Sequence, residues 1–208
     1  ITEQLAQSLH STPIHLNTRV MSTTPGSVTL ENGHTISARA IVVATEGPAA
    51  SSLLSLRAVA SQAAGAVYFA APTSPIEGSY IVLDGEGRGP VYNVAVMSQV
   101  SPYYAPHGQH LIAAALPGLV DGDIEAAARR QLRGWWGAQV DEWRHLRSYR
   151  IPHGQPGQTS PFNPHERVAL GEGMFVCGDH RDTASIQGAM YSGRRCAESV
   201  AEWVTLQS

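Results

Sequence analysis

An acidic residue and the first turn of a helix near the C-terminus have the chemistry to hold a nucleotide-type ligand. Gly178 and Asp179 follow the short apolar run 174–177, which is typical of a buried strand. The carboxyl end of a strand faces the crevice in which open α/β sheets bind ligands, so Asp179 can accept hydrogen bonds from sugar-type hydroxyls there. A polar turn follows, and Ser185 is the expected N-cap of a long helix.

That helix begins with free backbone donors and contains two glycines. The amides of Ile186 and Gln187 offer hydrogen bonds and the positive end of the helix dipole to an anionic or carbonyl oxygen. Gly188 and Gly193 each cost about 1 kcal/mol relative to Ala, which indicates close approach of a ligand or of a packed helix. One stripe of the helix is expected to face a core; it comprises Ile186, Ala189, Met190, Gly193, Ala197, Val200 and Val204.

The residues alone leave two interpretations of this strand, turn and helix open. In the first, they form one side of a nucleotide cofactor site. In the second, Gly178-Asp179 is only a turn and the glycines serve helix–helix contact, because the same order of elements is common in α/β proteins.

Composition indicates a globular chain and excludes some partners. The 208 residues are 43% hydrophobic and 15% charged, with a net charge of −3, which argues against disorder and against nucleic acid as a partner. No apolar segment reaches the roughly 18 residues of a transmembrane helix, and no signal peptide is recognised. Cys177 and Cys196 are expected to be buried thiols, which favours a cytoplasmic location. His107 and His110 lack an accompanying Cys, Asp or Glu cluster, so no metal site is expected.

Hydrophobic patterning divides the chain into a mixed part and a β-rich part. Near the N-terminus the patterns predict alternating helical and extended segments, namely a helix at 3–10, a strand at 14–20, a hairpin turn at Asn32-Gly33, a strand at 40–44 and a helix at 51–57. From residue 66 onward they predict an antiparallel sheet backed by a helix at 121–136, capped by Asp121 or Asp123. The expected strands of that sheet are 66–69, 80–83, 91–96, 110–114 and 143–151, the last broken by Pro152.

The stretch 173–200 closely resembles the C-terminal FAD-binding signature of the flavin-containing amine oxidoreductase superfamily; it reads GMFVCGDHRDTASIQGAMYSGRRCAESV. This superfamily includes amine oxidases, protoporphyrinogen oxidases and phytoene-desaturase-like enzymes. The resemblance implies that Asp179, after Gly178, holds a hydroxyl of the ribityl chain of FAD. It also implies that the amides of the helix start that Ser185 caps face the pyrimidine edge of the flavin or nearby cofactor oxygens; these are the amides around Ile186, Gln187 and Gly188.

The resemblance extends along the whole chain, because the order of helix, strand ending in Val, hairpin and second strand also matches the superfamily. It implies that Val20 contacts the adenine of FAD through its backbone. It further implies a mixed α/β fold in which residues 1–52 and 152–208 form a partial FAD-binding, Rossmann-like domain. Residues 53–151 would be the inserted substrate domain, an antiparallel sheet with a helix.

The glycine fingerprint that holds the FAD pyrophosphate in this superfamily, G-x-G-x-x-G, is absent from the sequence. The run GEGRGP at 85–90 fails the spacing and precedes a strand, so it predicts a hairpin turn. We therefore expect the chain to be the C-terminal portion of a longer enzyme, or a subunit that another chain completes. By itself it is expected to bind FAD weakly or not at all.

Two departures from the superfamily bear on the reaction. Many of its amine oxidases place a Lys, through a water, opposite the flavin and an aromatic residue after the Gly-Asp-like motif; this chain has no Lys and has His180-Arg181-Asp182 there. Both favour a desaturase-like or protoporphyrinogen-oxidase-like dehydrogenation of a small or hydrophobic organic substrate over simple amine oxidation. All three residues would lie near the flavin ring, where Arg181 could steady a reduced flavin or a substrate carboxylate, or form a local ion pair with Asp182. No catalytic residue is assigned, and the alternative is a non-catalytic remnant or binding module that keeps the fold without cofactor.

Overall fold

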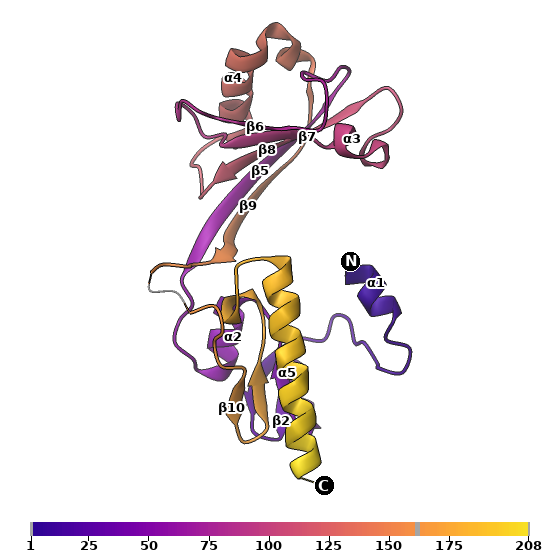
Figure 1. Ribbon diagram of the computed structural model, residues 1–208, viewed down its shortest axis with the longest axis vertical. Coiled ribbons are helices and arrows are strands. Elements are labelled where there is room, and N and C mark those ends of the chain that lie inside the picture. The colour runs from indigo at the N-terminus through magenta and orange to yellow at the C-terminus, as the bar shows by residue number, and fades with distance from the viewer. Residues whose placement is uncertain (1, 161–162, 208) are drawn as a thin grey trace. The chain divides into compact units, whose positions relative to one another are not determined.

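The computed structural model describes residues 2–160 and 163–207, and the chain forms two compact units (Figure 1). Unit 1 contains the residues up to Ala58 and those from Ser160 onward, and unit 2 contains Val59–Thr159. Each unit has a buried core of its own. No helix in the described ranges is both long enough and apolar enough to cross a membrane.

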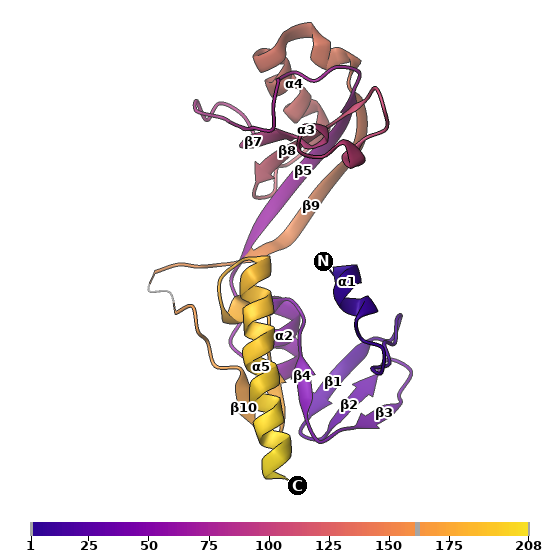
Figure 2. The same ribbon diagram turned by 45° about the vertical axis from the view of Figure 1, so that its right-hand side comes forward.

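Unit 2 is built on a five-stranded antiparallel sheet in the order β6-β7-β8-β5-β9. Its strands are β5 (Ser61–Ala71), β6 (Ile81–Leu83), β7 (Asn93–Val96), β8 (His110–Pro117) and β9 (Arg144–Pro156). The helical elements that join them are α3 (Met97–Val100), η1 (Pro102–Tyr104), α4 (Ile124–Trp136) and η2 (Gly137–Glu142). Helix α4 lies over one face of the sheet (Figures 1 and 2). The predicted antiparallel sheet with a backing helix is therefore confirmed.

The core of unit 2 lies between the sheet and α4. Strand β5 alternates, so that Val67, Phe69 and Ala71 point to the α4 side, where each is at most 1% exposed. They belong to one cluster with Ala128 and Leu132 of α4. The intervening β5 residues point to the opposite face, which is only half-buried.

Two details of unit 2 refine the predictions. Of the two candidate caps, Asp123 caps α4, because its Oδ1 accepts a hydrogen bond from the Ala126 amide at 3.0 Å. Pro152 interrupts the pairing of the last strand but does not end it, because the register shifts after Ile151 and β9 continues to Pro156, which pairs with Ser61 of β5. β9 is an edge strand, where a proline removes no ladder hydrogen bond if its nitrogen faces outward.

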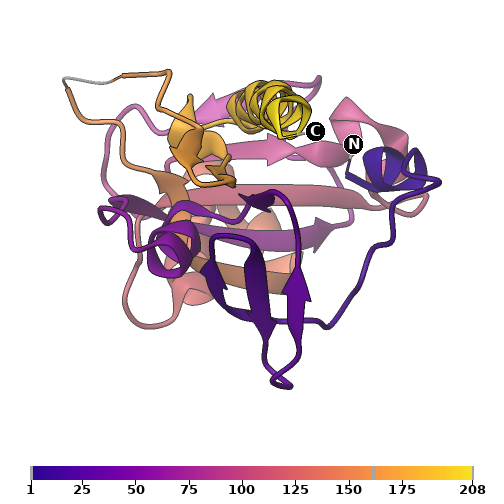
Figure 3. The same ribbon diagram turned by 90° about the horizontal axis from the view of Figure 1, so that it is seen from below.

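Unit 1 contains two three-stranded sheets in its described residues. One sheet, in the order β1-β2-β3, comprises β1 (Val20–Thr24), β2 (Ser27–Leu30) and β3 (Thr35–Ser37). The other, in the order β10-β11-β4, comprises β4 (Ile41–Val43), β10 (Ala169–Gly171) and β11 (Met174–Val176). The helical elements are α1 (Thr2–Gln7), α2 (Gly47–Leu54), the single turn η3 (Asp179–Arg181) and α5 (Ile186–Leu206). Figure 3 shows α5 end-on and the β1-β2-β3 sheet apart from it.

Strand β11 is the buried centre of the second sheet, as its short apolar run predicts. It pairs in parallel with β4 on one side and antiparallel with β10 on the other. Phe175 and Cys177 pack against Cys196 of α5. Val176, whose side chain points to the opposite face, packs with Val43 and with α2. Helices therefore cover both faces of this strand.

The buried face of α5 differs from the predicted stripe, of which Val200 packs against the core as expected. Ile186 and Met190 are 67% and 50% exposed, whereas the helix buries Gly188, Ser192 and Cys196, four residues apart. Small side chains at this spacing let the helix lie close to the sheet. The prediction fails because it is based on apolar side chains, whereas the contact of α5 with the sheet is made by small side chains.

The strand predicted at 14–20 is also wrong, because β1 begins at Val20 rather than ending there. Asn17 adopts a φ of 53°, a left-handed conformation that interrupts an extended run. Ile14 and Leu16, which were expected to share a strand face, are exposed. The hairpin at Asn32-Gly33 is confirmed, since it joins β2 to β3.

Candidate functional site

Two strand ends meet at one edge of the small sheet in unit 1. Strands β4 and β11 are parallel, with Val43 opposite Val176, so the segments that follow them emerge at the same edge. The Cys177 amide donates to the Val43 carbonyl at 3.0 Å, which carries the pairing one residue further. An acidic residue follows each strand. Glu46 is the exposed N-cap residue of α2, with no side-chain capping bond, and Asp179 begins η3.

The turn between β11 and η3 requires a glycine. Gly178 has a φ of 149°, and a Cβ there would lie 2.6 Å from ring atoms of His180 and 3.3 Å from the Thr45 carbonyl oxygen. Its amide donates to Ser192 Oγ of α5 at 3.0 Å. The turn is therefore held between β4 and α5, and it sets the position of Asp179.

Asp179 presents a carboxylate that is not committed to the protein. Its side chain is 32% exposed, and in the described ranges the one ionisable partner near it is His180, with Nδ1 4.0 Å from Oδ1. Among the described residues no group donates a hydrogen bond to this carboxylate. Its backbone carbonyl is engaged, because it accepts the Asp182 amide at 3.0 Å and so closes η3. The side chain can accept hydrogen bonds from a hydroxyl-bearing ligand.

The N-terminus of α5 offers two free amides. Ser185 is its N-cap, as predicted, and its Oγ accepts the Gly188 amide at 2.9 Å. The Ile186 and Gln187 amides donate to no residue in the described part of the chain. They are therefore available to an anionic or carbonyl oxygen.

Gly188 is needed by the chain itself. A Cβ there would collide with the carbonyl oxygen of Thr183, in the turn that precedes α5. The close approach predicted at this glycine is thus that of the protein's own backbone. At Gly193 an added Cβ would meet no described atom within 4 Å.

His180 is a buried imidazole without a hydrogen-bond partner. Its side chain is 1% exposed, and neither ring nitrogen has a partner among the described residues. Burial lowers the pKa of His180 below its ordinary value, the Arg181 cation lowers it further, and the Asp179 carboxylate opposes them. The ring is therefore neutral at pH 7 and can accept or donate one hydrogen bond at each nitrogen.

Arg181 and Asp182 do not form the local ion pair that was one interpretation of their sequence. Arg181 Nη1 lies 4.0 Å from Glu166 Oε2, and burial lowers the pKa of this guanidinium while Glu166 opposes the shift. Asp182 is 6% exposed, and its Oδ2 lies 3.3 Å from His165 Nδ1 and 3.6 Å from Arg195 Nη2. Both side chains are committed to other segments of unit 1.

Sequence reasoning missed Glu166, His165 and Arg195, which hold this turn in place. Arg195 Nη2 also donates to the Arg181 carbonyl at 2.9 Å, so it ties α5 to the end of η3. No local pattern connects a loop residue with a helix residue about thirty positions away. The one local hint in the sequence is the arginine pair at 194–195, because it places positive charge on a helix that packs against the sheet through small residues.

The two thiols beside the site are free and buried, as predicted. A hydrogen bond with the Cys196 thiol lowers the pKa of Cys177 to about 7, and burial opposes that shift. The same interaction, together with burial, raises the pKa of Cys196.

Val20 belongs to the other sheet of unit 1, at the start of β1. β1 is an edge strand of the β1-β2-β3 sheet, so one side of its backbone has no neighbouring strand within that sheet. The preceding Arg19 carbonyl accepts the Glu31 amide at 2.9 Å, which fixes the entry to the strand.

Solved structures share the fold of the chain at low sequence identity. An oxidoreductase from Methanosarcina mazei matches with a TM-score of 0.62 and 14% identity, over 94% of this chain and 52% of that one. A reduced UDP-galactopyranose mutase matches with a TM-score of 0.61 and 13% identity, over 89% and 45%. Iminodiacetate oxidase from Chelativorans sp. BNC1 matches with a TM-score of 0.54 and 14% identity, over 96% and 52%. The chain thus spans about half the length of the solved structures it matches.

No curated protein matches the chain. The family model described as flavin containing amine oxidoreductase matches residues 1–201, which is nearly all of the sequence. This match includes β11, the Gly178 turn and most of α5. The chain therefore belongs to the flavin-containing amine oxidoreductase family.

Proposed function

We propose that the corner formed by β11, η3 and the start of α5 binds FAD, as part of an oxidoreductase that dehydrogenates a small or hydrophobic organic substrate. The observation that carries the proposal is the uncommitted Asp179 carboxylate beside a helix start with two free amides. These groups fit a cofactor that bears both sugar-type hydroxyls and carbonyl oxygens. FAD, when bound, would accept the hydride from the substrate.

The contacts proposed for Asp179 and for the start of α5 use groups that the protein leaves unpaired. Asp179 would accept a hydrogen bond from a ribityl hydroxyl, and the Ile186 and Gln187 amides would donate to the flavin ring. Gly178, Ser185 and Gly188 would shape the corner, since the Gly188 amide is already donated to Ser185. The outer backbone edge at Val20 would bind the adenine.

The residues after Asp179 differ in what they can offer the flavin. His180 would lie near the flavin, but its side chain is 1% exposed and both unpartnered ring nitrogens are buried, so we assign it no direct hydrogen bond to the ring. Arg181 could lend positive potential to a reduced flavin, although its pairing with Glu166 weakens that role. Asp182 is already engaged by His165 and Arg195, and we assign it to holding the turn.

The proposed binding roles are divided between the two units. We propose that residues 1–52 and 152–208 form the partial FAD-binding domain and that residues 53–151 form the substrate domain. A segment with the G-x-G-x-x-G fingerprint, from the same or another polypeptide, would complete the pyrophosphate site. The 208 residues alone are then expected to bind FAD weakly or not at all.

The test compares FAD binding by the 208-residue chain with binding by a longer protein that carries the glycine fingerprint. We expect the longer protein to retain flavin. Asp179→Ala should weaken its FAD affinity about tenfold, the scale of one charge-assisted hydrogen bond. Asp121→Ala, which removes an exposed carboxylate in unit 2, should leave it unchanged.

Equal FAD affinity in the Asp179→Ala and Asp121→Ala proteins would remove Asp179 from the site. Failure of the longer protein to bind flavin would favour the alternative function, a binding module that keeps the fold without cofactor. Strong flavin retention by the 208 residues alone would contradict the need for a completing segment.

A further inference from the structure

The open face of the unit 2 sheet, opposite α4, carries a hollow produced by strand register. Ala70 of β5 is directly opposite Leu111 of β8 on one side and Arg144 of β9 on the other. Residues directly opposite in antiparallel strands project to the same face with Cβ atoms about 5 Å apart. One small side chain therefore lies between two large ones, and a cavity of about 250 Å³ opens there.

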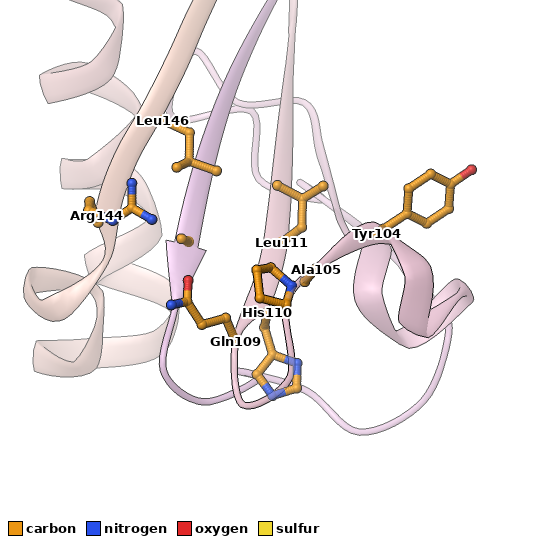
Figure 4. A pocket seen from close by; sticks show the side chains of 9 residues that line it. Tyr104, Ala105, Gln109, His110, Leu111, Arg144 and Leu146 are labelled. Atoms are coloured by element: carbon orange, nitrogen blue, oxygen red, sulfur yellow. The ribbon is translucent and has the colours of Figure 1, made fainter.

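A β-bulge adds a second apolar wall. The pairing of β9 shifts between His145, opposite Phe69, and Arg147, opposite Tyr68, which leaves Leu146 as the extra residue. Such a bulge re-aims a side chain, and Leu146 lines the same cavity as Arg144. In Figure 4 the side chains of Arg144, Leu146, Leu111 and Gln109 surround the end of β5.

The segment between η1 and β8 closes the cavity at its other side. Ala105 and Pro106 line it together with Gln109. Figure 4 shows the Tyr104 ring and the His110 imidazole directed away from the space between the strands, and His110 Nδ1 is hydrogen-bonded to Ser98 Oγ at 3.1 Å. Tyr104 and His110 also belong to the lining, but the polar groups directed toward the space between the strands are the Arg144 guanidinium and the Gln109 amide.

The Arg144 charge has no counter-ion in the described part of the chain. No described carboxylate pairs with it, and none lines the cavity. The neighbouring Arg147 differs, because its guanidinium lies 5.3 Å from the centre of the Tyr149 ring, above its face. An unpaired guanidinium beside an apolar hollow matches a ligand that joins an anionic group to a compact apolar body.

We propose that this cavity binds a small carboxylate with an apolar body. Arg144 would hold the carboxylate in a bidentate pair, Gln109 would donate a further hydrogen bond, and Leu111 and Leu146 would enclose the apolar part over Ala70. The volume is below that of typical drug-sized sites, about 300–1,000 Å³, so the ligand is small. The proposal concerns unit 2 alone and does not depend on FAD binding in unit 1.

Phenylacetate and phenylacetamide, which have the same apolar body with and without the charge, are the probes. Calorimetric titration of the 208-residue chain should give one phenylacetate site and at least about tenfold weaker binding of phenylacetamide. Arg144→Gln should weaken phenylacetate binding by a similar factor. Arg147→Gln, the matched control, removes the same charge from the next position along this face, outside the cavity lining, and should change it less than about twofold.

A second readout locates the ligand. Amide NMR shifts on adding phenylacetate should change most at Ala70 and Leu111, and the Ala70→Leu protein, whose larger side chain fills the hollow, should bind at least about tenfold more weakly. Thermal melts will verify that every variant is folded. Equal weakening by Arg144→Gln and Arg147→Gln would show mere charge attraction and overturn the proposal. Equal binding of the two probes, or no phenylacetate binding, would overturn it as well.

Discussion

At the scale of single residues, the corner formed by β11, η3 and the start of α5 contains polar groups of two kinds. Some are hydrogen-bonded within the protein, and others have no partner in it. The Gly188 amide and the Asp182 carboxylate are used within the protein. The Asp179 carboxylate and both ring nitrogens of His180 have no hydrogen-bond partner among the described residues. The sequence pointed to all four positions, yet only contacts between distant segments decide which side chains are available to a ligand.

The buried His180 makes stability depend on pH. Its folded-state pKa lies below the ordinary value of 6.5, so the unfolded chain binds a proton at higher pH than the folded chain does. The contribution of His180 to the free energy of unfolding is therefore largest above about pH 6.5, and it decreases as the pH is lowered through that value.

Urea unfolding from about pH 7.5 to about pH 5.5 should show this loss, and a His180→Phe protein should lose less stability over the same range. The exposed His34, replaced in the same way, is the control and should leave the wild-type pH profile intact. An unchanged profile in the His180→Phe protein would contradict a buried, neutral His180.

At the scale of elements, most of the fold could be read from the sequence. The strands of unit 2 and β11 are apolar or alternating runs between Gly and Pro clusters, and α4 and α5 have side-chain caps, Asp123 and Ser185. Periodicity could not identify the buried face of α5, because Ser192 and Cys196 are inside while Met190 is not. The length of β9 could not be predicted either, since its pairing with β5 resumes beyond Pro152 after a shift in register.

The two glycines of α5 should respond in opposite directions to the same substitution. Gly188→Ala places a Cβ against the Thr183 carbonyl, and we expect it to lower the free energy of unfolding by about 1–3 kcal/mol, as for overpacked cores. Gly193→Ala meets no described atom within 4 Å and should raise it by about 1 kcal/mol through helix propensity.

Urea denaturation of the two proteins, monitored by far-UV circular dichroism, gives both values under one set of conditions. The opposite signs are the prediction. Stabilisation by Gly188→Ala would mean that the Thr183 turn yields easily, and would remove the argument that this glycine is required by the protein's own backbone.

At the scale of the whole molecule, unit 2 is expected to fold alone. Val59–Thr159 is continuous in sequence and contains a complete cluster that includes Phe69, Leu132 and Trp143. About 100 residues around one core is within the size of independent domains. The boundary of this unit, at 59 and 159, differs by a few residues from the 53–151 proposed for the substrate domain.

The polypeptide 59–159 should therefore unfold cooperatively and keep the near-UV dichroism of its buried Trp143. Limited proteolysis of the 208-residue chain should release a fragment of about this size, because cuts are expected where few contacts cross. A non-cooperative melt of the isolated segment would show that unit 2 requires the rest of the chain.

The pairing of Ser61 with Pro156 places the first and last strands of unit 2 side by side where the chain enters and leaves it. A segment whose two ends are neighbours can be exchanged for another of different length without altering the connectivity of the host. Recombination at these two points would graft a new sheet onto the β4, β11 and α5 framework, which offers a direct route to hybrid proteins with an exchanged unit 2.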